Sequence, residues 1–186
     1  PLHEPSMGRE EIDFVNRTIK KNFVSTKGIY VQKFEKRIQN YTNSKYVSSL
    51  INGTQAIFIA LKVLNIKSND EVLVPALTFI GTVNAITYLG AEPHFVDSRI
   101  DDFGIDCKKL ENYLSEIVVI KNNKSVNKKT GRIIKAIIPV HVFGHPCDIE
   151  GVMNLSKKFK LKVVEDAAEC FGSFYKKKHL GTFGDI

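Results

Sequence analysis

Apolar residues recur at helical spacing near the start of the chain. Between Glu10 and Phe23, and again between Val31 and Tyr41, they fall at every third or fourth position. The positions are Ile12, Val15, Ile19 and Phe23 in the first segment and Val31, Phe34, Ile38 and Tyr41 in the second. This period predicts two amphipathic helices, each with one apolar face.

The pattern then changes to short apolar runs that alternate with helical segments. The runs predict strands at Tyr46–Leu50, Glu71–Pro75, Pro93–Asp97, Arg132–Val140 and Lys160–Asp166, of which Arg132–Val140 is strongly β-branched. Helices are predicted at Gly53–Leu64, Gly81–Gly90, Cys107–Leu114 and Asp148–Phe159. The first of these is apolar on nearly all sides, which predicts a buried helix. Asp106 and Asp148 are candidate N-caps for the last two.

Alternating strands and helices predict an α/β fold with three αβα layers around a mostly parallel sheet. No linker or internal repeat divides the chain, so we predict one domain over residues 1–186. The basic stretch from Lys121 to Lys135 interrupts the pattern and is predicted to be a solvated hairpin or loop.

The amino-acid composition limits the class of protein and its cellular compartment. The apolar share of 43% and the charged share of 25% are ordinary for a soluble globular protein. No apolar run approaches the roughly 20 residues that span a bilayer. The polar N-terminus does not resemble a signal peptide, so we expect a cytoplasmic protein that binds no membrane. Three dispersed cysteines, Cys107, Cys147 and Cys170, are expected to be free thiols.

The net charge of +7 favours an anionic partner. The basic stretch lacks the interleaved aromatic residues that stack on bases, so we expect no nucleic acid. The alternative is that this basic stretch touches a phosphate-bearing ligand.

Three segments follow predicted strands, where ligands bind in a parallel sheet. They are "INGTQ", "PALTF" and "EDAAE". Gly53 and Thr54 lie at a helix start, whose free N–H groups and dipole suit a phosphate. The alternative is an ordinary helix cap by Asn52 or Thr54. Phe79 could stack on a planar cofactor, or it could belong to the core.

Asp166 follows a predicted strand in "KVVEDAAECFG", directly after Glu165. Either the strand simply reaches the surface there, or it delivers an acid to a ligand. A carboxylate that faces a protonated ring nitrogen keeps that nitrogen charged. Pyridoxal 5′-phosphate needs this contact, so phosphate site, ring and acid together favour that cofactor. His141 and His145 lie four apart without a clear further ligand, so we predict no metal.

Several longer segments carry a family resemblance. In chain order they are "PLHEPSMG", "FVSTKGIYVQKFE", "NGTQAIFIAL", "VLVPALTFIGTVNAITYLGAEPHFVD", "AIIPVHVFGHPCDIEGV", "VVEDAAECFGSFY" and "HLGTFGDI". Together they resemble the DegT/DnrJ/EryC1/StrS family of sugar-nucleotide aminotransferases, which use pyridoxal phosphate and have fold type I. Each segment alone is weak, but their ordered occurrence along the whole chain is specific.

The resemblance implies the large domain of these enzymes and a role for each candidate residue. Asp166 would pair with the pyridine nitrogen, and Glu169, where many relatives carry Gln or His, would lie near the ring hydroxyl. Phe79 would stack on one ring face. The cofactor-binding set implied is Gly53, Thr54, Phe79, Asp166, Ala168 and Glu169.

The resemblance also implies residues that this sequence lacks. In the family a serine and then the Schiff-base lysine follow the "GTFGDI" motif, so both, and the C-terminal domain, would lie beyond Ile186. We therefore expect no catalytic residue among the 186 and predict that the chain alone is not an active transaminase. Lys176, Lys177 and Lys178 precede the motif and are expected to form a solvated turn.

The intact protein is expected to move an amino group from an amino acid, with glutamate as donor, to a nucleotide-linked 4-keto-6-deoxy sugar for polysaccharide or glycan synthesis. The resemblance is greatest to members that aminate a UDP-linked amino sugar, as in legionaminate or bacillosamine pathways. It implies a homodimer with active sites at the subunit interface.

Three alternatives stay open. The chain could be a non-catalytic fragment of a split or truncated gene. It could be part of a pyridoxal phosphate-dependent sugar dehydratase, in which histidine replaces the lysine. It could be an unrelated nucleotide-sugar-binding Rossmann enzyme, although the absence of GxGxxG counts against this.

Overall fold

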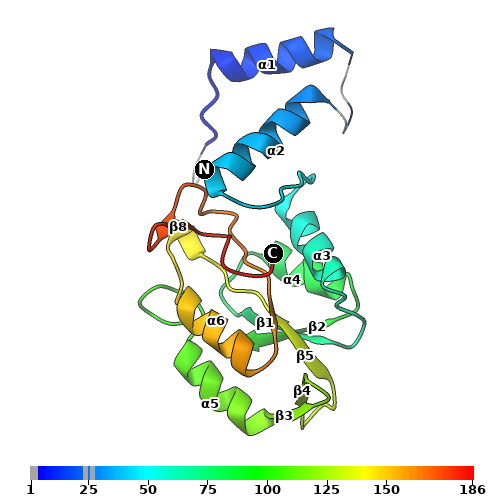
Figure 1. Ribbon diagram of the computed structural model, residues 1–186, viewed down its shortest axis with the longest axis vertical. Helices are drawn as coiled ribbons and strands as arrows, with labels where there is room; N and C mark the ends of the chain where they lie inside the picture. Colours follow the sequence, from blue (N-terminus) through cyan, green and yellow to red (C-terminus); the bar gives the residue numbers. More distant parts are fainter. Residues whose placement is uncertain (1–3, 23–24, 26–27) are drawn as a thin grey trace. The chain divides into compact units, whose positions relative to one another are not determined.

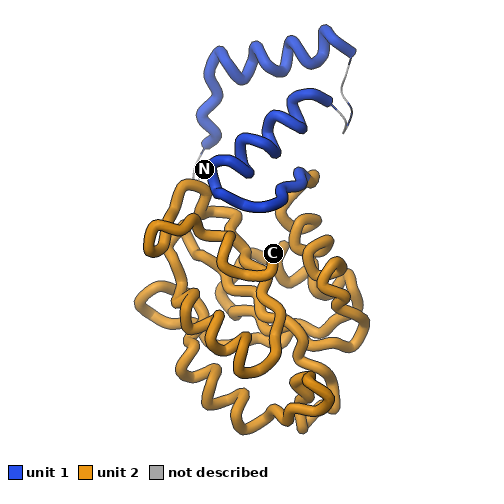
Figure 2. Tube along the Cα trace, in the orientation of Figure 1, with its two compact units in different colours: residues 1–49 blue, residues 50–186 orange. Residues whose placement is uncertain are grey.

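The structure is a computed structural model that describes residues 4–22, 25 and 28–186. It divides into two compact units, Pro1–Ser49 and Leu50–Ile186, which are coloured separately in Figure 2. One domain over residues 1–186 stays a prediction. Every described helix is too short or too polar to cross a bilayer.

The first unit contains the two amphipathic helices that the periodicity predicted, α1 (Arg9–Lys20) and α2 (Ile29–Thr42). None of the described residues in these helices is buried. The rings of Phe14 and Tyr30 meet edge to face with their centroids 5.5 Å apart. Phe23, expected at the end of the first helix, lies outside the described residues.

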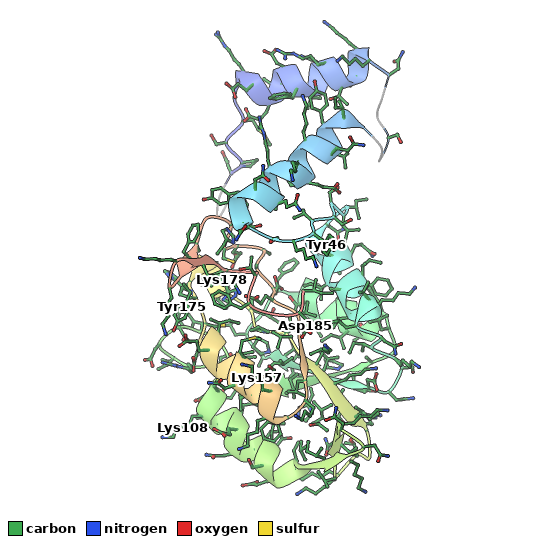
Figure 3. The ribbon with its side chains drawn as sticks, viewed as in Figure 1. Tyr46, Lys108, Lys157, Tyr175, Lys178 and Asp185 are labelled. Carbon is green, nitrogen blue, oxygen red and sulfur yellow. The ribbon has the colours of Figure 1, made fainter. Side chains whose placement is uncertain are left out.

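The strand predicted at Tyr46–Leu50 is wrong, because residues 46–50 have no regular secondary structure. The Glu35 carboxylate accepts hydrogen bonds from the Ser49 amide at 2.8 Å and from its hydroxyl at 2.9 Å. A side chain therefore takes a donor that a neighbouring strand would have needed. Tyr46, labelled in Figure 3, is 81% exposed and has no strand face to pack on. Local β propensity alone does not make a strand without such a partner.

A six-stranded sheet forms the centre of the second unit. Its strands are β1 (Glu71–Pro75), β2 (Glu92–Val96), β3 (Val118–Lys121), β4 (Lys124–Asn127), β5 (Ile133–Ile137) and β6 (Lys162–Val163). The order is β2-β1-β5-β4-β3, and β6 also pairs with β5. The pairs among β1, β2, β5 and β6 are parallel, whereas β3 and β4 are antiparallel and form a hairpin that extends into the basic stretch, as one alternative held. The hairpin is not fully solvated as expected, because Ser125 and Asn127 are buried.

Helices cover both faces of this sheet (Figure 1). α3 (Gly53–Val63) and α4 (Ile80–Thr87) share one apolar cluster with Val72 and Val74 of β1. α5 (Cys107–Ile117) and α6 (Ile149–Lys158) share the other cluster with Leu73. Successive side chains of a strand point to opposite faces, so one strand serves both clusters. The predicted three-layer αβα fold with a mostly parallel sheet is confirmed.

The predicted N-caps of α5 and α6 are also confirmed. Asp106 accepts the Lys109 amide and Asp148 accepts the Gly151 amide, each at 3.0 Å. The expectation that the helix at Gly53–Leu64 is buried all round is wrong, because Val63 is 70% exposed. Its buried residues are Ile57, Ala60 and Leu61, on the side that packs on the sheet and α4.

A small two-stranded sheet follows Asp166 and was not predicted. It consists of β7 (Phe174–Tyr175) and β8 (Lys178–His179). Lys176 and Lys177 form its turn with φ of 47° and 66°, as expected of a solvated turn, whereas Lys178 already belongs to β8. Figure 3 labels Tyr175 and Lys178 on either side of this turn. The Lys176 ammonium pairs with Glu150 of α6 at 2.7 Å, which ties the hairpin to the helix layer.

Candidate functional site

A cavity of about 500 Å³ lies where the carboxyl end of β1, the start of α3 and the residues after β6 meet. The segments "INGTQ", "PALTF" and "EDAAE" all contribute to its wall, although the first follows no strand. The wall includes every cofactor-binding residue that the sequence predicts: Gly53, Thr54, Phe79, Asp166, Ala168 and Glu169. The structure thus brings the predicted residues together, while their roles toward a ligand stay predictions.

The start of α3 leaves backbone donors available at this cavity. The Asn52 side chain accepts the Gln55 amide at 2.9 Å, and its carbonyl accepts the Ala56 amide at 3.0 Å. Asn52 is therefore an N-cap, as one alternative held. The cap does not use the amides of Gly53 and Thr54, which have no acceptor within the helix. A Cβ added at Gly53 would meet no atom within 4 Å, so a ligand can approach this backbone closely.

Phe79 lies at the rim of the cavity. It is the residue before α4 and is 77% exposed, so it does not belong to the core. A Cβ added at Gly81 would lie 2.5 Å from the Thr54 hydroxyl oxygen and 3.1 Å from Cδ1 of the Phe79 ring. Gly81 therefore lets α4 come close to the start of α3. No local sequence pattern signals this role of Gly81, because Thr54, the residue that it lets approach, belongs to another helix.

Asp166 lies three residues after β6 and forms an isolated parallel bridge with Val140. Its amide donates to the Pro139 carbonyl at 2.9 Å. Its Oδ2 accepts the Thr82 hydroxyl at 2.5 Å, and its Oδ1 accepts the Ala168 amide at 3.3 Å. The side chain is half-buried in the cavity wall, so the strand does not simply reach the surface here.

Glu165, the preceding acid, is buried and has a different task. Its Oε1 accepts the amides of Phe183 at 2.5 Å and Gly184 at 2.6 Å. Its Oε2 accepts the Gly181 amide at 3.0 Å and Nε2–H of His141 at 3.1 Å. Burial raises the pKa of Glu165, but these hydrogen bonds outweigh it and hold the pKa below its ordinary value. Both acids are evident in the sequence, whereas the role of Glu165 is evident only in the structure.

His141 is buried between two partners. Its Nδ1 accepts the Cys147 amide at 3.3 Å, so the ring proton lies on Nε2 and is donated to Glu165. Both ring nitrogens are therefore occupied by hydrogen bonds within the protein. Over the described residues, no group of three or more His, Cys, Asp or Glu side chains is arranged to hold a metal ion.

Glu169 contacts the loop on the far side of the cavity. Its Oε2 accepts the Phe143 amide at 2.8 Å. Phe143 has a φ of 53°, which is uncommon for a residue with a side chain, and Gly144 follows at 79°. A Cβ at Gly144 would lie 2.8 Å from the Glu169 carbonyl oxygen. Glu169 therefore stabilises a left-handed turn whose Phe143 side chain also lines the cavity.

The last residues of the chain run beside β6. The Glu165 amide donates to the Ile186 carbonyl, and the Asp185 amide donates to the Val163 carbonyl, each at 2.9 Å. The Asp185 carboxylate, labelled in Figure 3, accepts the Val163 amide at 2.9 Å and the Lys162 ammonium at 2.7 Å. These bonds and those of Glu165 hold residues 181–186 against the strand.

The three cysteines are buried and free, as predicted. Burial raises the pKa of Cys107 to about 12 and that of Cys170 to about 11, and it also raises the pKa of Cys147. Because the thiolate is the reactive form, none of these thiols is suited to act as a nucleophile near neutral pH.

The αβα fold around a mostly parallel sheet is that of the fold type I pyridoxal phosphate enzymes, which the similar solved structures share. Residues 5–186 match the model of the DegT/DnrJ/EryC1/StrS aminotransferase family. The chain belongs to this family, which confirms the predicted family and its cofactor, pyridoxal 5′-phosphate.

Individual relatives agree with this assignment. GDP-perosamine synthase from Escherichia coli O157:H7 is 41% identical over 186 residues, which is 100% of this chain and 47% of that protein. The aminotransferase from Psychrobacter cryohalolentis has a TM-score of 0.83 at 31% identity and covers 97% of this chain and 42% of that one. NtdA from Bacillus subtilis with bound cofactor PMP has a TM-score of 0.73 at 30% identity, over 90% of this chain and 36% of that one. The chain thus spans less than half the length of these proteins.

Proposed function

We propose that this chain is the cofactor-binding part of a nucleotide-sugar aminotransferase. The whole protein would move an amino group from an amino acid, with glutamate as the expected donor, to a nucleotide-linked 4-keto-6-deoxy sugar. It would do so as a cytoplasmic homodimer. The observation that carries the proposal is that helix start, aromatic ring and carboxylate line one cavity. The relative named for GDP-perosamine supports a nucleotide-linked sugar as substrate.

The residues present fit pyridoxal 5′-phosphate. The amides of Gly53 and Thr54 would bind its phosphate, where a helix start places both donors and a positive dipole end. Phe79 and Ala168 would lie on either face of the ring, and Glu169 would lie near the ring hydroxyl. The bound cofactor supplies an electron sink for amino-group transfer.

Asp166 has the most specific role in this proposal. An ionised carboxylate beside the ring nitrogen holds a proton on that nitrogen, because the opposite charge favours the protonated form. The bonds from Thr82 and Ala168 orient the carboxylate before any ligand arrives. No lysine of the 186 residues is assigned the covalent role, which the family resemblance places after the "GTFGDI" motif.

Binding of pyridoxamine 5′-phosphate to the full 186-residue chain tests the proposal. This form carries no aldehyde, so it does not react with surface lysines and reports the cavity alone. We expect Asp166→Asn to weaken binding about 10- to 100-fold, since a hydrogen bond to a charged group is lost. Gly53→Ala should also weaken binding while leaving folding intact, because the added methyl group meets no protein atom.

The matched control is Asp101→Asn, which changes an exposed aspartate with 72% of its side chain accessible. Pyridoxamine without its phosphate should bind the wild-type chain much more weakly and should not distinguish Gly53→Ala from it. Equal affinity of the Asp166→Asn and wild-type chains for the phosphorylated probe, or no binding at all, would show that the cavity is not the proposed site.

A further inference from the structure

Two threonine hydroxyls form a chain of hydrogen bonds that ends on Asp166. The Thr78 hydroxyl donates to the Thr82 hydroxyl oxygen at 3.0 Å, and the Thr82 hydroxyl donates to Asp166 Oδ2 at 2.5 Å. An ionised carboxylate only accepts, so Thr82 must give it its single proton and is left as an acceptor for Thr78. The direction of both bonds is therefore determined by chemistry.

The middle member of this chain is held rigidly. Thr82 is 1% exposed and lies in α4, where Ala85 and Ile86 are also fully buried. A β-branched side chain in a helix has few χ1 rotamers, so the Thr82 hydroxyl has little freedom to move away. The bond from Thr82 spans 84 residues of sequence and joins α4 to the segment after β6.

We propose that Thr82, with Thr78 behind it, is a positioning residue for the cofactor ring nitrogen. This inference rests on the proposed function of Asp166. The terminal torsion of an aspartate is broad, so a free carboxylate would present its oxygens in many orientations. Thr82 holds Oδ2 and the Ala168 amide holds Oδ1, which together fix the plane of the carboxylate. A carboxylate has about four lone-pair sites, so lone pairs stay available for the ring N–H.

A purely structural role is the competing explanation, in which Thr82 only ties α4 to the strand. The two roles differ in whether a change at Thr82 alters cofactor binding or only the stability of the chain. If Thr82 were only a structural tie, removing its hydroxyl would lower the free energy of unfolding and leave the bound ring unchanged. A positioning role alters the affinity for the cofactor and the protonation of its ring nitrogen in a folded chain.

The test uses the full 186-residue chain and pyridoxamine 5′-phosphate labelled with ¹⁵N in the ring. Affinity is measured by fluorescence titration, ring-nitrogen protonation by the ¹⁵N shift, and folding by urea denaturation. We expect Thr82→Val to weaken binding about 5- to 10-fold, the usual effect of one hydrogen bond. It should also move the ¹⁵N shift toward the unprotonated form. Thr82→Ser keeps the hydroxyl and should restore both readouts.

Two further variants keep the inference testable if Thr82→Val folds poorly. Thr78→Val leaves the bond from Thr82 to Asp166 in place and removes the outer bond, together with the longer contact of the Thr78 hydroxyl to the Phe79 carbonyl at 3.4 Å. It should therefore give a smaller change in the same direction, about twofold. Thr87→Val is the matched control, because Thr87 is in the same helix but is exposed and donates to the Asn84 carbonyl.

The outcomes separate this inference from the proposed function. If Asp166→Asn loses affinity while folded Thr82→Val and Thr78→Val match the wild type in affinity and ¹⁵N shift, the threonines are structural only. If Asp166→Asn also matches the wild type, or the wild type does not bind the probe, the proposed function fails and this inference fails with it.

Discussion

Replacing Glu165 with glutamine removes a buried charge that four hydrogen-bond donors share. Two donors, the amides of Phe183 and Gly184, point at Oε1, and two others, the Gly181 amide and Nε2–H of His141, point at Oε2. A glutamine oxygen can serve one of these pairs. Its NH₂ group then faces the other pair, donor against donor, in either orientation of the amide.

The magnitude follows from this count. Two donors, at least partly buried, lose their acceptor, and each unsatisfied buried group costs about 1–3 kcal/mol. Small movements of the backbone and side chains will restore some hydrogen bonding and recover part of this cost. We therefore expect Glu165→Gln to lower the free energy of unfolding by about 3 kcal/mol. Glu165→Ala leaves all four donors without this acceptor and should cost about 3–5 kcal/mol, the range for breaking a buried charged interaction.

Urea unfolding of the 186-residue chain measures the loss, and hydrogen exchange locates it. The amides of Gly181, Phe183 and Gly184 should exchange faster in Glu165→Gln than in the wild type. The matched control is Glu111→Gln, which breaks only an exposed pair with Lys158 and should change stability by less than about 0.5 kcal/mol. If Glu165→Gln unfolds within that margin and the three amides stay protected, Glu165 does not hold this segment.

Two further predictions concern titration and reactivity. Burial raises the pKa of Glu165 and of Glu71, the first residue of β1. Hydrogen bonds outweigh burial in both, at Glu71 those from the Thr130 hydroxyl and the Asn127 side-chain amide, and leave each pKa below the ordinary value of 4.5. The unfolded chain therefore binds protons first as pH falls, so the stability from these groups is complete above about pH 4.5 and is lost as pH drops through the folded-state pKa. Urea midpoints should fall below that pH, and less steeply in Glu71→Gln; equal slopes would contradict the assignment. The three buried thiols should resist iodoacetamide at pH 8 in the native chain and react in urea. Rapid labelling without denaturant would show that burial does not protect them.

Local patterns predicted much of the second unit from the sequence. The strand Glu71–Pro75 has the bounds that the apolar run and its proline indicated, and Asp106 and Asp148 cap the helices that follow them. Such features depend on residues a few positions apart. The strand predicted at Tyr46–Leu50 failed because pairing needs a neighbour, and the Glu35 carboxylate takes the Ser49 amide instead.

The sequence by itself determined the three-layer fold, the family and the set of residues at one sheet edge, because periodicity and motif order are written along the chain. Only the tertiary structure decided how the two adjacent acids divide their tasks. Asp166 lies in the cavity wall with Thr82 behind it, while Glu165 binds the amides of residues 181–184. The partner of Asp166 lies 84 residues away in sequence, and no local pattern signals it. The physical reason is that parallel strands and their crossover helices bring distant segments to one edge, where hydrogen-bond geometry assigns each side chain its role.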